Sequence, residues 1–110
     1  MEVSVQNITQ LSDLKALIDS GAAVLVDFFA TWCGPCKLLS PRLHVLAQEN
    51  RSVNIIKVDV DQAAEISEEY AVSAMPTVIG FCGGEKIDTV VGFNDGKITA
   101  LVQRLQCKFY

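Results

Sequence analysis

The sequence lacks the features that would place it in several common classes of protein. Its longest apolar stretch is interrupted by Asp27 and is far too short to span a bilayer. The net charge is −4, which argues against a nucleic-acid partner. No basic stretch followed by an apolar one opens the chain, so we expect no secretory signal and a cytoplasmic location. A chain of 110 residues without repeats or linkers suits one domain, residues 1–110.

The sequence is equally poor in residues that would hold a cofactor or a metal ion. It contains no phosphate-binding glycine motif, because the glycines at 83–84 have the pattern of a hairpin turn. Structural zinc normally takes four cysteine or histidine ligands. Beyond one closely spaced cysteine pair, the other candidates are not paired at ligand spacing: they are Cys82, Cys107 and His44. We therefore expect neither a cofactor nor a metal, and we predict that His44 is a surface residue of a helix.

What the chain does contain is the motif Trp32-Cys33-Gly34-Pro35-Cys36, directly after an apolar run and directly before a helical pattern. Cys33 therefore stands where a buried strand passes into a helix, and its sulfur faces backbone N–H groups that lack partners within the helix. Those donors and the positive end of the helix dipole favour a thiolate over a thiol. Cys36 follows one turn later on the same face, within reach of Cys33.

The two cysteines could form half of a zinc site, an inert structural bridge or a redox-active pair. The spare ligands are too few for zinc, and a bridge between residues one turn apart would constrain the unfolded chain little. We favour redox chemistry, in which Cys33, nearer solvent, is the nucleophile. Cys36, more shielded, then resolves the mixed disulfide by attacking Cys33, so that Cys33–Cys36 is a redox-active disulfide.

Two charged residues interrupt apolar strands. Asp27 lies between Val26 and Phe28, where burial would raise the pKa of its carboxyl group. It is either a structural residue satisfied by a lysine or a backbone N–H, or a proton acceptor and donor for the thiol of Cys36. Lys57 interrupts another strand in the same way. Alone, Lys57 would be a solvated edge residue; together with Asp27 it is a candidate ionic partner across adjacent strands.

Hydrophobic periodicity predicts an α/β fold in the order β-α-β-α-β-α-β-β-α, with a mixed sheet and helices on both faces. Only the strands that flank the glycine turn are predicted to pair antiparallel. Thr9 should cap the first helix and Gly21 should end it, while Asn94 or Asp95 should cap the last. Pro41 lies inside the second helix and should kink it. The predicted strands cover residues 3–8, 23–29, 53–60, 77–82 and 86–91, and the two middle helices cover 37–50 and 62–70.

With these residues the chain resembles the thioredoxin family over essentially its full length. The matches come in the same order and at the family's spacing, which chance does not explain. The resemblance implies the thioredoxin fold, a central five-stranded mixed sheet flanked by four helices, whose last two strands run antiparallel to the others. It is carried by Val26-Asp27-Phe28, the run from Ala30 to Lys37, Pro41, Lys57-Val58-Asp59, Met75-Pro76-Thr77, Gly84 and Gly92.

The resemblance also implies a docking surface for a client protein. The Met75–Pro76 peptide bond should be cis, and the backbone of Met75 should pair with the client strand beside the dithiol. Small residues next to the sulfur would let a folded partner bring its own disulfide close. The residues implied to bind the client are Trp32, Gly34, Pro35, Met75, Pro76 and Gly92, with the loop near Ala74 completing the surface.

The function that the resemblance implies is reduction of protein disulfides by dithiol–disulfide exchange. Thioredoxin reductase, using NADPH through flavin, would then re-reduce the protein. The implied clients are peroxiredoxin, ribonucleotide reductase and methionine sulfoxide reductase, and we expect a monomer. Two alternatives stay open. One is an oxidase or isomerase, which usually carries His where this chain has Pro35. The other is a non-enzymatic binding subunit or inhibitor of a partner protein.

The chain departs from the family's shared pattern at four positions. Phe29 stands where tryptophan is common and fills the volume without an indole N–H. Phe93 follows Gly92 where a smaller residue is common, which should affect which partners dock. Cys82 is predicted to be a small buried strand residue, with a regulatory thiol as the alternative. Cys107, near the end of the last helix, is either incidental or a site of dimerisation or glutathionylation.

Overall fold

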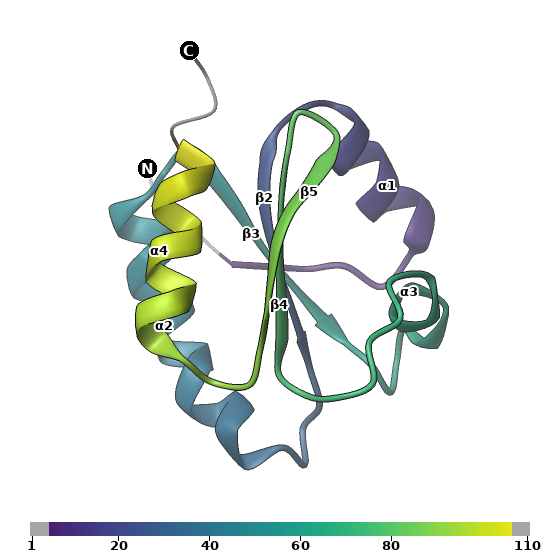
Figure 1. Ribbon diagram of the computed structural model, residues 1–110. Helices are drawn as coiled ribbons and strands as arrows, with labels where there is room; N and C mark the ends of the chain where they lie inside the picture. The colour runs from purple at the N-terminus through teal and green to yellow at the C-terminus, as the bar shows by residue number, and fades with distance from the viewer. Residues whose placement is uncertain (1–4, 107–110) are drawn as a thin grey trace.

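The computed structural model describes residues 5–106 and confirms the predicted order of strands and helices (Figure 1). Within those residues, no helix is both long and apolar enough to cross a membrane. The strands are β1 (Gln6–Asn7), β2 (Ala23–Phe29), β3 (Val53–Asp59), β4 (Thr77–Cys82) and β5 (Glu85–Val91). The helices are α1 (Leu11–Asp19), α2 (Gly34–Glu49), α3 (Ala64–Glu69) and α4 (Asp95–Gln106).

Several helices and strands begin or end at other residues than predicted, and capping residues account for some of these differences. β1 has only two residues, and α3 is shorter than predicted at both ends. The N-cap of α1 is Gln10, whose side chain makes no capping hydrogen bond, so the predicted Thr9 cap is wrong. α2 begins at Gly34, earlier than predicted, because the Cys33 side chain caps it. The predicted Asn94 cap of α4 is confirmed, since its Oδ1 accepts a hydrogen bond from the backbone N–H three residues later at 3.0 Å.

The sheet has the strand order β1-β3-β2-β4-β5, with β1 and β2 both parallel to β3. β4 is antiparallel to both β2 and β5, so there are two antiparallel pairs where one is predicted. These two reversals leave β5 pointing the same way as β2, and only β4 opposes the other strands. The implication that both last strands are reversed is therefore wrong for β5.

The length of α3 explains why β4 is reversed. Its six residues rise about 9 Å, less than half of the roughly 23 Å that the seven-residue β3 spans. A helix this short does not carry the chain back to the far end of the sheet, so β4 starts at the edge where β2 and β3 end. The loops after β2 and β3 and the loop before β4 therefore meet at one edge.

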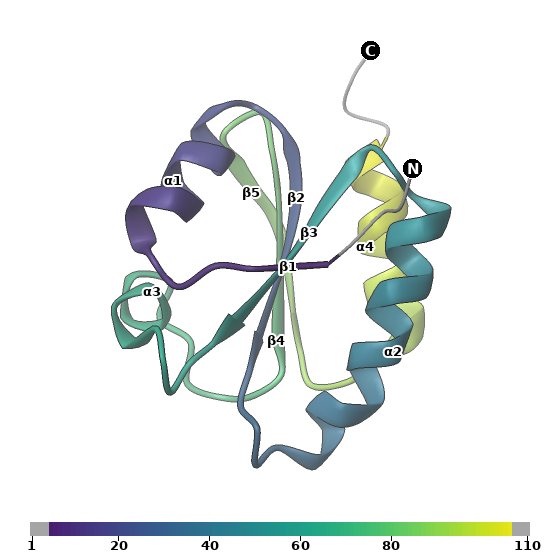
Figure 2. The ribbon, with the colours of Figure 1, turned by 180° about the vertical axis from the view of Figure 1, so that it is seen from behind.

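Two helices cover each face of the sheet: α1 and α3 lie on one side, and α2 and α4 on the other (Figures 1 and 2). Successive residues of β2 point to opposite faces. Val26 and Phe28 join the apolar cluster under α1 and α3, whereas Leu25 joins the cluster under α2 and α4. Asp27, two residues after Leu25, and Lys57, its neighbour in register on β3, therefore point towards α2 and α4.

Candidate active site

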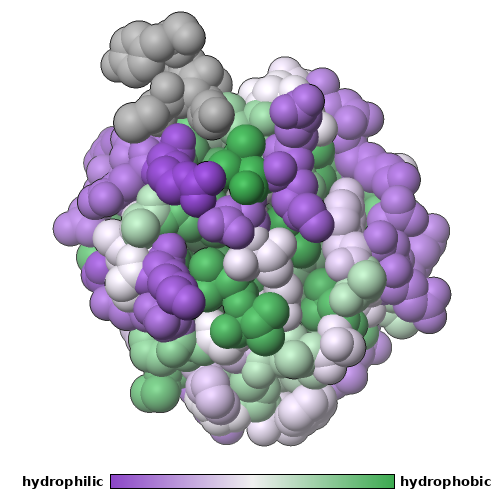
Figure 3. Space-filling view, in the orientation of Figure 1, coloured by the Kyte–Doolittle hydropathy of each residue, from purple (hydrophilic) through white to green (hydrophobic). Residues whose placement is uncertain are grey.

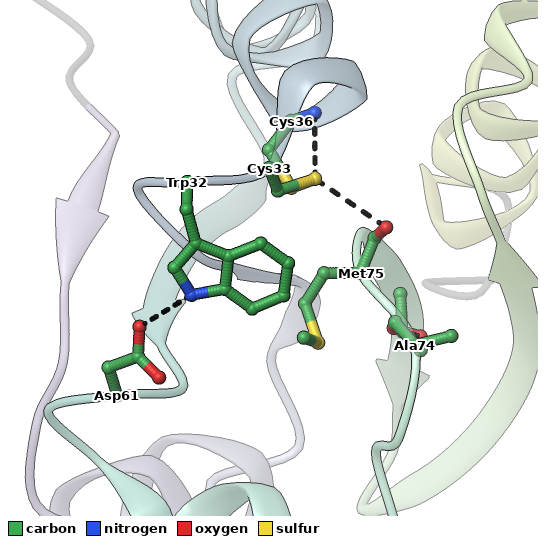
Figure 4. Close-up of a disulfide and its surroundings, with 7 residues drawn as sticks. Trp32, Cys33, Cys36, Asp61, Ala74 and Met75 are labelled. Carbon is green, nitrogen blue, oxygen red and sulfur yellow. Dashed lines mark hydrogen bonds between the residues drawn. A yellow bond between two sulfur atoms is a disulfide. The ribbon is translucent and has the colours of Figure 1, made fainter.

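The candidate site is a disulfide between Cys33 and Cys36 at the start of α2 (Figure 4). Cys33 is the N-cap residue, with extended backbone angles, and the Cys36 N–H donates a hydrogen bond to Cys33 Sγ at 3.2 Å. Pro35 fits in the first turn because N–H groups there have no partner within the helix. The structure thus places a backbone donor at the sulfur of Cys33, as the position of the motif predicts.

The two sulfur-bearing residues are equally sheltered in this disulfide form. Cys33 is 5% exposed and Cys36 is 4% exposed, so the predicted contrast between an open and a shielded cysteine is wrong for this form. The reason is packing: Ala30 is buried beside the pair, and Phe29 and Met75 pack against it. Little of either cysteine is therefore exposed to solvent in this form.

The loop before β4 lies against the disulfide. The Met75–Pro76 peptide bond is cis, and the Met75 carbonyl oxygen lies 3.5 Å from Cys33 Sγ. Pro76 is buried and Met75 is half-buried. Two hydrogen bonds fix the loop: Thr77 Oγ1 donates to the Ala74 carbonyl at 2.6 Å, and the Gly92 N–H donates to the Pro76 carbonyl at 2.8 Å. Segments far apart in the sequence are therefore assembled beside one sulfur.

Trp32 stands at the surface beside the disulfide and is held by a residue that the sequence did not single out. Its indole N–H donates a hydrogen bond to Asp61 Oδ2 at 3.0 Å, although its side chain is 65% exposed (Figure 4). The Asp61 N–H in turn donates to Asp59 Oδ1 at 3.0 Å. A signal was present, because Asp59 ends a strand parallel to β2 and Asp61 follows two residues later, at the same edge of the sheet.

Apolar side chains reach the surface at this edge: Trp32, Val91 and Phe93 are exposed, and Met75 is half-buried. Val91 is 65% exposed and Phe93 is 36% exposed. In Figure 3, apolar and weakly polar residues gather in the lower half of the view, where the loops before β4 and after β5 lie, while the strongly hydrophilic residues lie mainly above them and to either side. Val91 was not predicted as a site residue, because a valine at a strand end is usually a core residue.

Asp27 is fully buried on the sheet face that α2 covers. Burial raises the pKa of its carboxyl group from 3.8 to about 7, and the positive charge of Lys57 only partly opposes this rise. Neither carboxylate oxygen has a hydrogen-bond partner among residues 5–106. Near neutral pH this carboxyl group can therefore both accept and release a proton, which is the property that a proton carrier needs.

Lys57 lies opposite Asp27 in the register of β2 and β3, but its ammonium group has other partners. Lys57 Nζ donates a hydrogen bond to Ser40 Oγ at 3.0 Å and lies 4.4 Å from the centroid of the Phe29 ring. The ion pairs within 4.0 Å that join residues of the described part of the chain do not include Asp27 and Lys57. A direct ion pair between them is therefore not formed, because a hydroxyl on α2 and an aromatic face hold the ammonium.

The profile of the family described as Thioredoxin matches residues 5–104. The chain belongs to the thioredoxin family. The thioredoxin of Echinococcus granulosus is 48% identical over 90 residues, which cover 82% of this chain and 84% of that protein. Thioredoxin-2 of Pyricularia oryzae is 44% identical over 101 residues, which cover 92% of this chain and 59% of that longer protein. The solved structure of Malassezia sympodialis thioredoxin has a TM-score of 0.89 at 37% identity and covers 96% of this chain and 94% of that one.

Membership of the thioredoxin family makes this chain a protein-disulfide oxidoreductase, and Cys33 and Cys36 are the pair that exchanges dithiol for disulfide. The remaining candidates lie away from this pair. His44 is exposed on α2 and Cys82 is buried at the end of β4, both as predicted. Cys107 lies outside the described residues.

Proposed function

We propose that this member of the thioredoxin family is a general protein-disulfide reductase, with Cys33 as the nucleophile and Cys36 as the resolving cysteine. The observation that carries these roles is the hydrogen bond from the Cys36 N–H to Cys33 Sγ at the start of α2. In the reduced protein, this donor and the helix N-terminus favour negative charge on Cys33. The same sulfur lies beside the Met75 carbonyl, where a client strand would pair.

The exchange runs in two steps. The Cys33 thiolate attacks one sulfur of the client disulfide; the S–S bond breaks, and the other client sulfur leaves as a thiolate. Asp27 then accepts the proton of the Cys36 thiol, and the new thiolate attacks Cys33 Sγ. The second client sulfur leaves, two electrons have passed to the client, and the Cys33–Cys36 disulfide of this structure has formed.

The residues around the disulfide have binding roles in this proposal. Met75 would pair with the client backbone through its carbonyl and N–H groups, beside cis Pro76. Gly34 and Gly92 would leave room for the client's own disulfide. Pro35 stiffens the turn, and Trp32, held by Asp61, offers an apolar face.

Lys57 has a separate role from these contacts. Its positive charge acts on Asp27 without a direct ion pair and favours the carboxylate form.

The electron donor and the clients are proposed from the family. The donor is thioredoxin reductase, and the clients are peroxiredoxin, ribonucleotide reductase and methionine sulfoxide reductase. Support for a peroxiredoxin client comes from a solved structure, with a TM-score of 0.88 and 34% identity, that addresses thiol resolution in yeast mitochondrial 1-Cys peroxiredoxin through the glutathione and thioredoxin systems. We propose that the protein acts as a monomer in the cytoplasm.

The direct test is an insulin reduction assay with NADPH and a panel of thioredoxin and glutathione reductases. Precipitation of the insulin B chain is the readout. We expect turnover that depends on a thioredoxin reductase and saturates with it. Absence of turnover with every reductase, together with an oxidising dithiol potential, would instead support the oxidase or isomerase alternative. Full cellular function of a variant that lacks both cysteines would support the binding subunit.

The two cysteine roles are tested by single variants. Cys33→Ser should lose all measurable exchange, whereas Cys36→Ser should accumulate covalent mixed disulfides with clients, visible by non-reducing electrophoresis. Cys82→Ala, which changes a buried cysteine outside the site, is the matched control and should keep turnover. Trapping of clients by Cys33→Ser in place of Cys36→Ser would reverse the two roles.

A further inference from the structure

The contact between Lys57 and Ser40 is not explained by packing alone. Lys57 and Asp27 are neighbours in register on parallel strands and point to the same face of the sheet. Opposite charges in that position normally pair, and a buried carboxylate without a partner is costly. Yet the ammonium group of Lys57 turns to Ser40 Oγ at 3.0 Å and to the ring of Phe29 at 4.4 Å.

Both of these partners belong to the surroundings of the disulfide. Ser40 lies on α2 one turn after Cys36, so the two side chains share a helix face. Phe29 ends β2, packs against the disulfide, and offers a π face but no hydrogen-bond donor. An oxygen acceptor and an aromatic face thus both contact the same ammonium group.

We propose that Ser40 is a positioning residue: by accepting a hydrogen bond from Lys57, it holds the ammonium group away from Asp27 and keeps that carboxyl group available as a base. This inference rests on the proposed role of Asp27 as the proton acceptor of Cys36. A carboxylate locked in an ion pair would be a weaker base, because the pair stabilises its ionised form.

Lys57 is the charged residue that acts on the pKa of Asp27, because the other residues clustered on this face are apolar. On β4, its register partner is the apolar Val78. The buried residues that α2 and α4 contribute to this face are aliphatic, among them Leu39 and Leu101. Cys36 of α2, whose thiol Asp27 is proposed to deprotonate, does not titrate in the disulfide form. A change in the position of Lys57 should therefore be read directly in the pKa of Asp27.

The test is a ¹³C NMR titration of the Asp27 carboxyl carbon in the disulfide form, where neither active-site cysteine titrates. Ser40→Ala removes the acceptor, so Lys57 should turn to Asp27 and lower the pKa of Asp27 by about one pH unit. Ser40→Thr keeps a hydroxyl and should restore the wild-type value. Ser67→Ala is the matched control: this half-buried helix serine donates its hydroxyl to a backbone carbonyl on α3 and should change nothing.

The second readout is the pH profile of insulin reduction. In Ser40→Ala, its acidic limb should move to lower pH together with the pKa of Asp27. An unchanged Asp27 pKa in Ser40→Ala, or an equal fall in Ser67→Ala, would overturn the proposal while leaving the reductase function intact. If Ser40→Ala lowers the pKa of Asp27 but leaves the pH profile of insulin reduction unchanged, Ser40 positions Lys57 as proposed. Asp27 would then not be the base in the exchange mechanism.

Discussion

The two faces of the central sheet are built from the same strands but differ in chemistry. The face under α1 and α3 packs a cluster of apolar side chains, among them Phe28, Ile66 and Phe81, and within residues 5–106 it holds no buried charged residue. The face under α2 and α4 has an aliphatic cluster of similar size, but it also receives Asp27 and Lys57 and borders the disulfide. One face therefore supplies stability, while the other gives up some stability to hold ionisable groups near the reacting sulfurs.

Alternation along β2 makes this division possible. Phe28 and Asp27 are consecutive residues, yet they lie on opposite faces because side chains alternate along a strand. The cost of burying a carboxyl group is thus confined to one face, and the aromatic contacts of the other face are not disturbed. Variants at these two neighbouring positions should have effects of opposite sign.

The largest effect on stability is expected for Phe28→Ala. Phe28 is fully buried, and its ring centroid lies 6.1 Å from that of Tyr70, which in turn lies 5.6 Å from that of Phe81. Removing the ring leaves a cavity and should lower the free energy of unfolding by about 3–5 kcal/mol, measured by urea unfolding with the disulfide intact. Exchange activity should survive while the variant remains folded. A loss of under about 1 kcal/mol would mean that the apolar face does not carry the stability.

Asp27→Asn should raise the free energy of unfolding at high pH, whereas Phe28→Ala lowers it. Because the pKa of Asp27 is raised from 3.8 to about 7, the folded state holds a proton that the unfolded state has already released in this pH range. This contribution to stability is fully present below about pH 4 and is lost as the pH rises through about 7, by about 4 kcal/mol in total. The variant cannot titrate at this position, so its free energy of unfolding should lack this fall.

The measurement is urea unfolding at a series of pH values for wild type and Asp27→Asn. Other carboxyl groups titrate in both proteins, so the difference between the two curves isolates Asp27. Asp19→Asn, which changes an exposed carboxylate on α1, is the control and should follow wild type. If the free energy of unfolding changed with pH in the same way in wild type and Asp27→Asn, Asp27 would be an ordinary structural residue. The proposed difference between the two faces would then be wrong.

The local features of the fold and most of its strand pairings could be predicted from residue patterns, but the antiparallel pairing of β4 with β2 could not. The run 23–29 and the glycines at 83–84 fixed β2 and the final hairpin, because burial on both faces and a tight turn leave clear residue patterns. The reversal of β4 depends on the length of α3, which is uncertain by several residues in a single sequence.

Some residues of the candidate site could likewise be predicted from the sequence, and others could not. Cys33 and Cys36 could be predicted because their chemistry depends on a local motif at a helix start. Ser40 could not, because its hydrogen bond to Lys57 joins α2 and β3, which only the tertiary structure brings together. The contact of Asp61 with Trp32 could be found only by asking which strand ends meet at one edge of the sheet. Two charged residues on apolar strands predict the pairing of Asp27 with Lys57, but nothing in the sequence points to the competing acceptor on α2.

The smallest expected effect tests how closely the face under α2 and α4 is packed. Gly80 lies on β4 directly beneath Leu101 of α4: a Cβ atom built on this glycine would lie 2.9 Å from Leu101 Cδ1. Gly80→Ala should therefore lower the free energy of unfolding by about 1–2 kcal/mol, because a buried side chain must shift to admit the methyl group. The measurement is again urea unfolding of the disulfide form.

A double-mutant cycle separates this contact from a general effect of alanine in the strand. Leu101→Val shortens the opposing side chain, so Gly80→Ala should cost less in the Leu101→Val background than in wild type, with a coupling of about 0.5–1 kcal/mol. Strictly additive losses would show that the cost comes from the strand backbone. In that case Leu101 could shift without cost to admit a methyl group, and α4 would not be closely packed on β4 at this position.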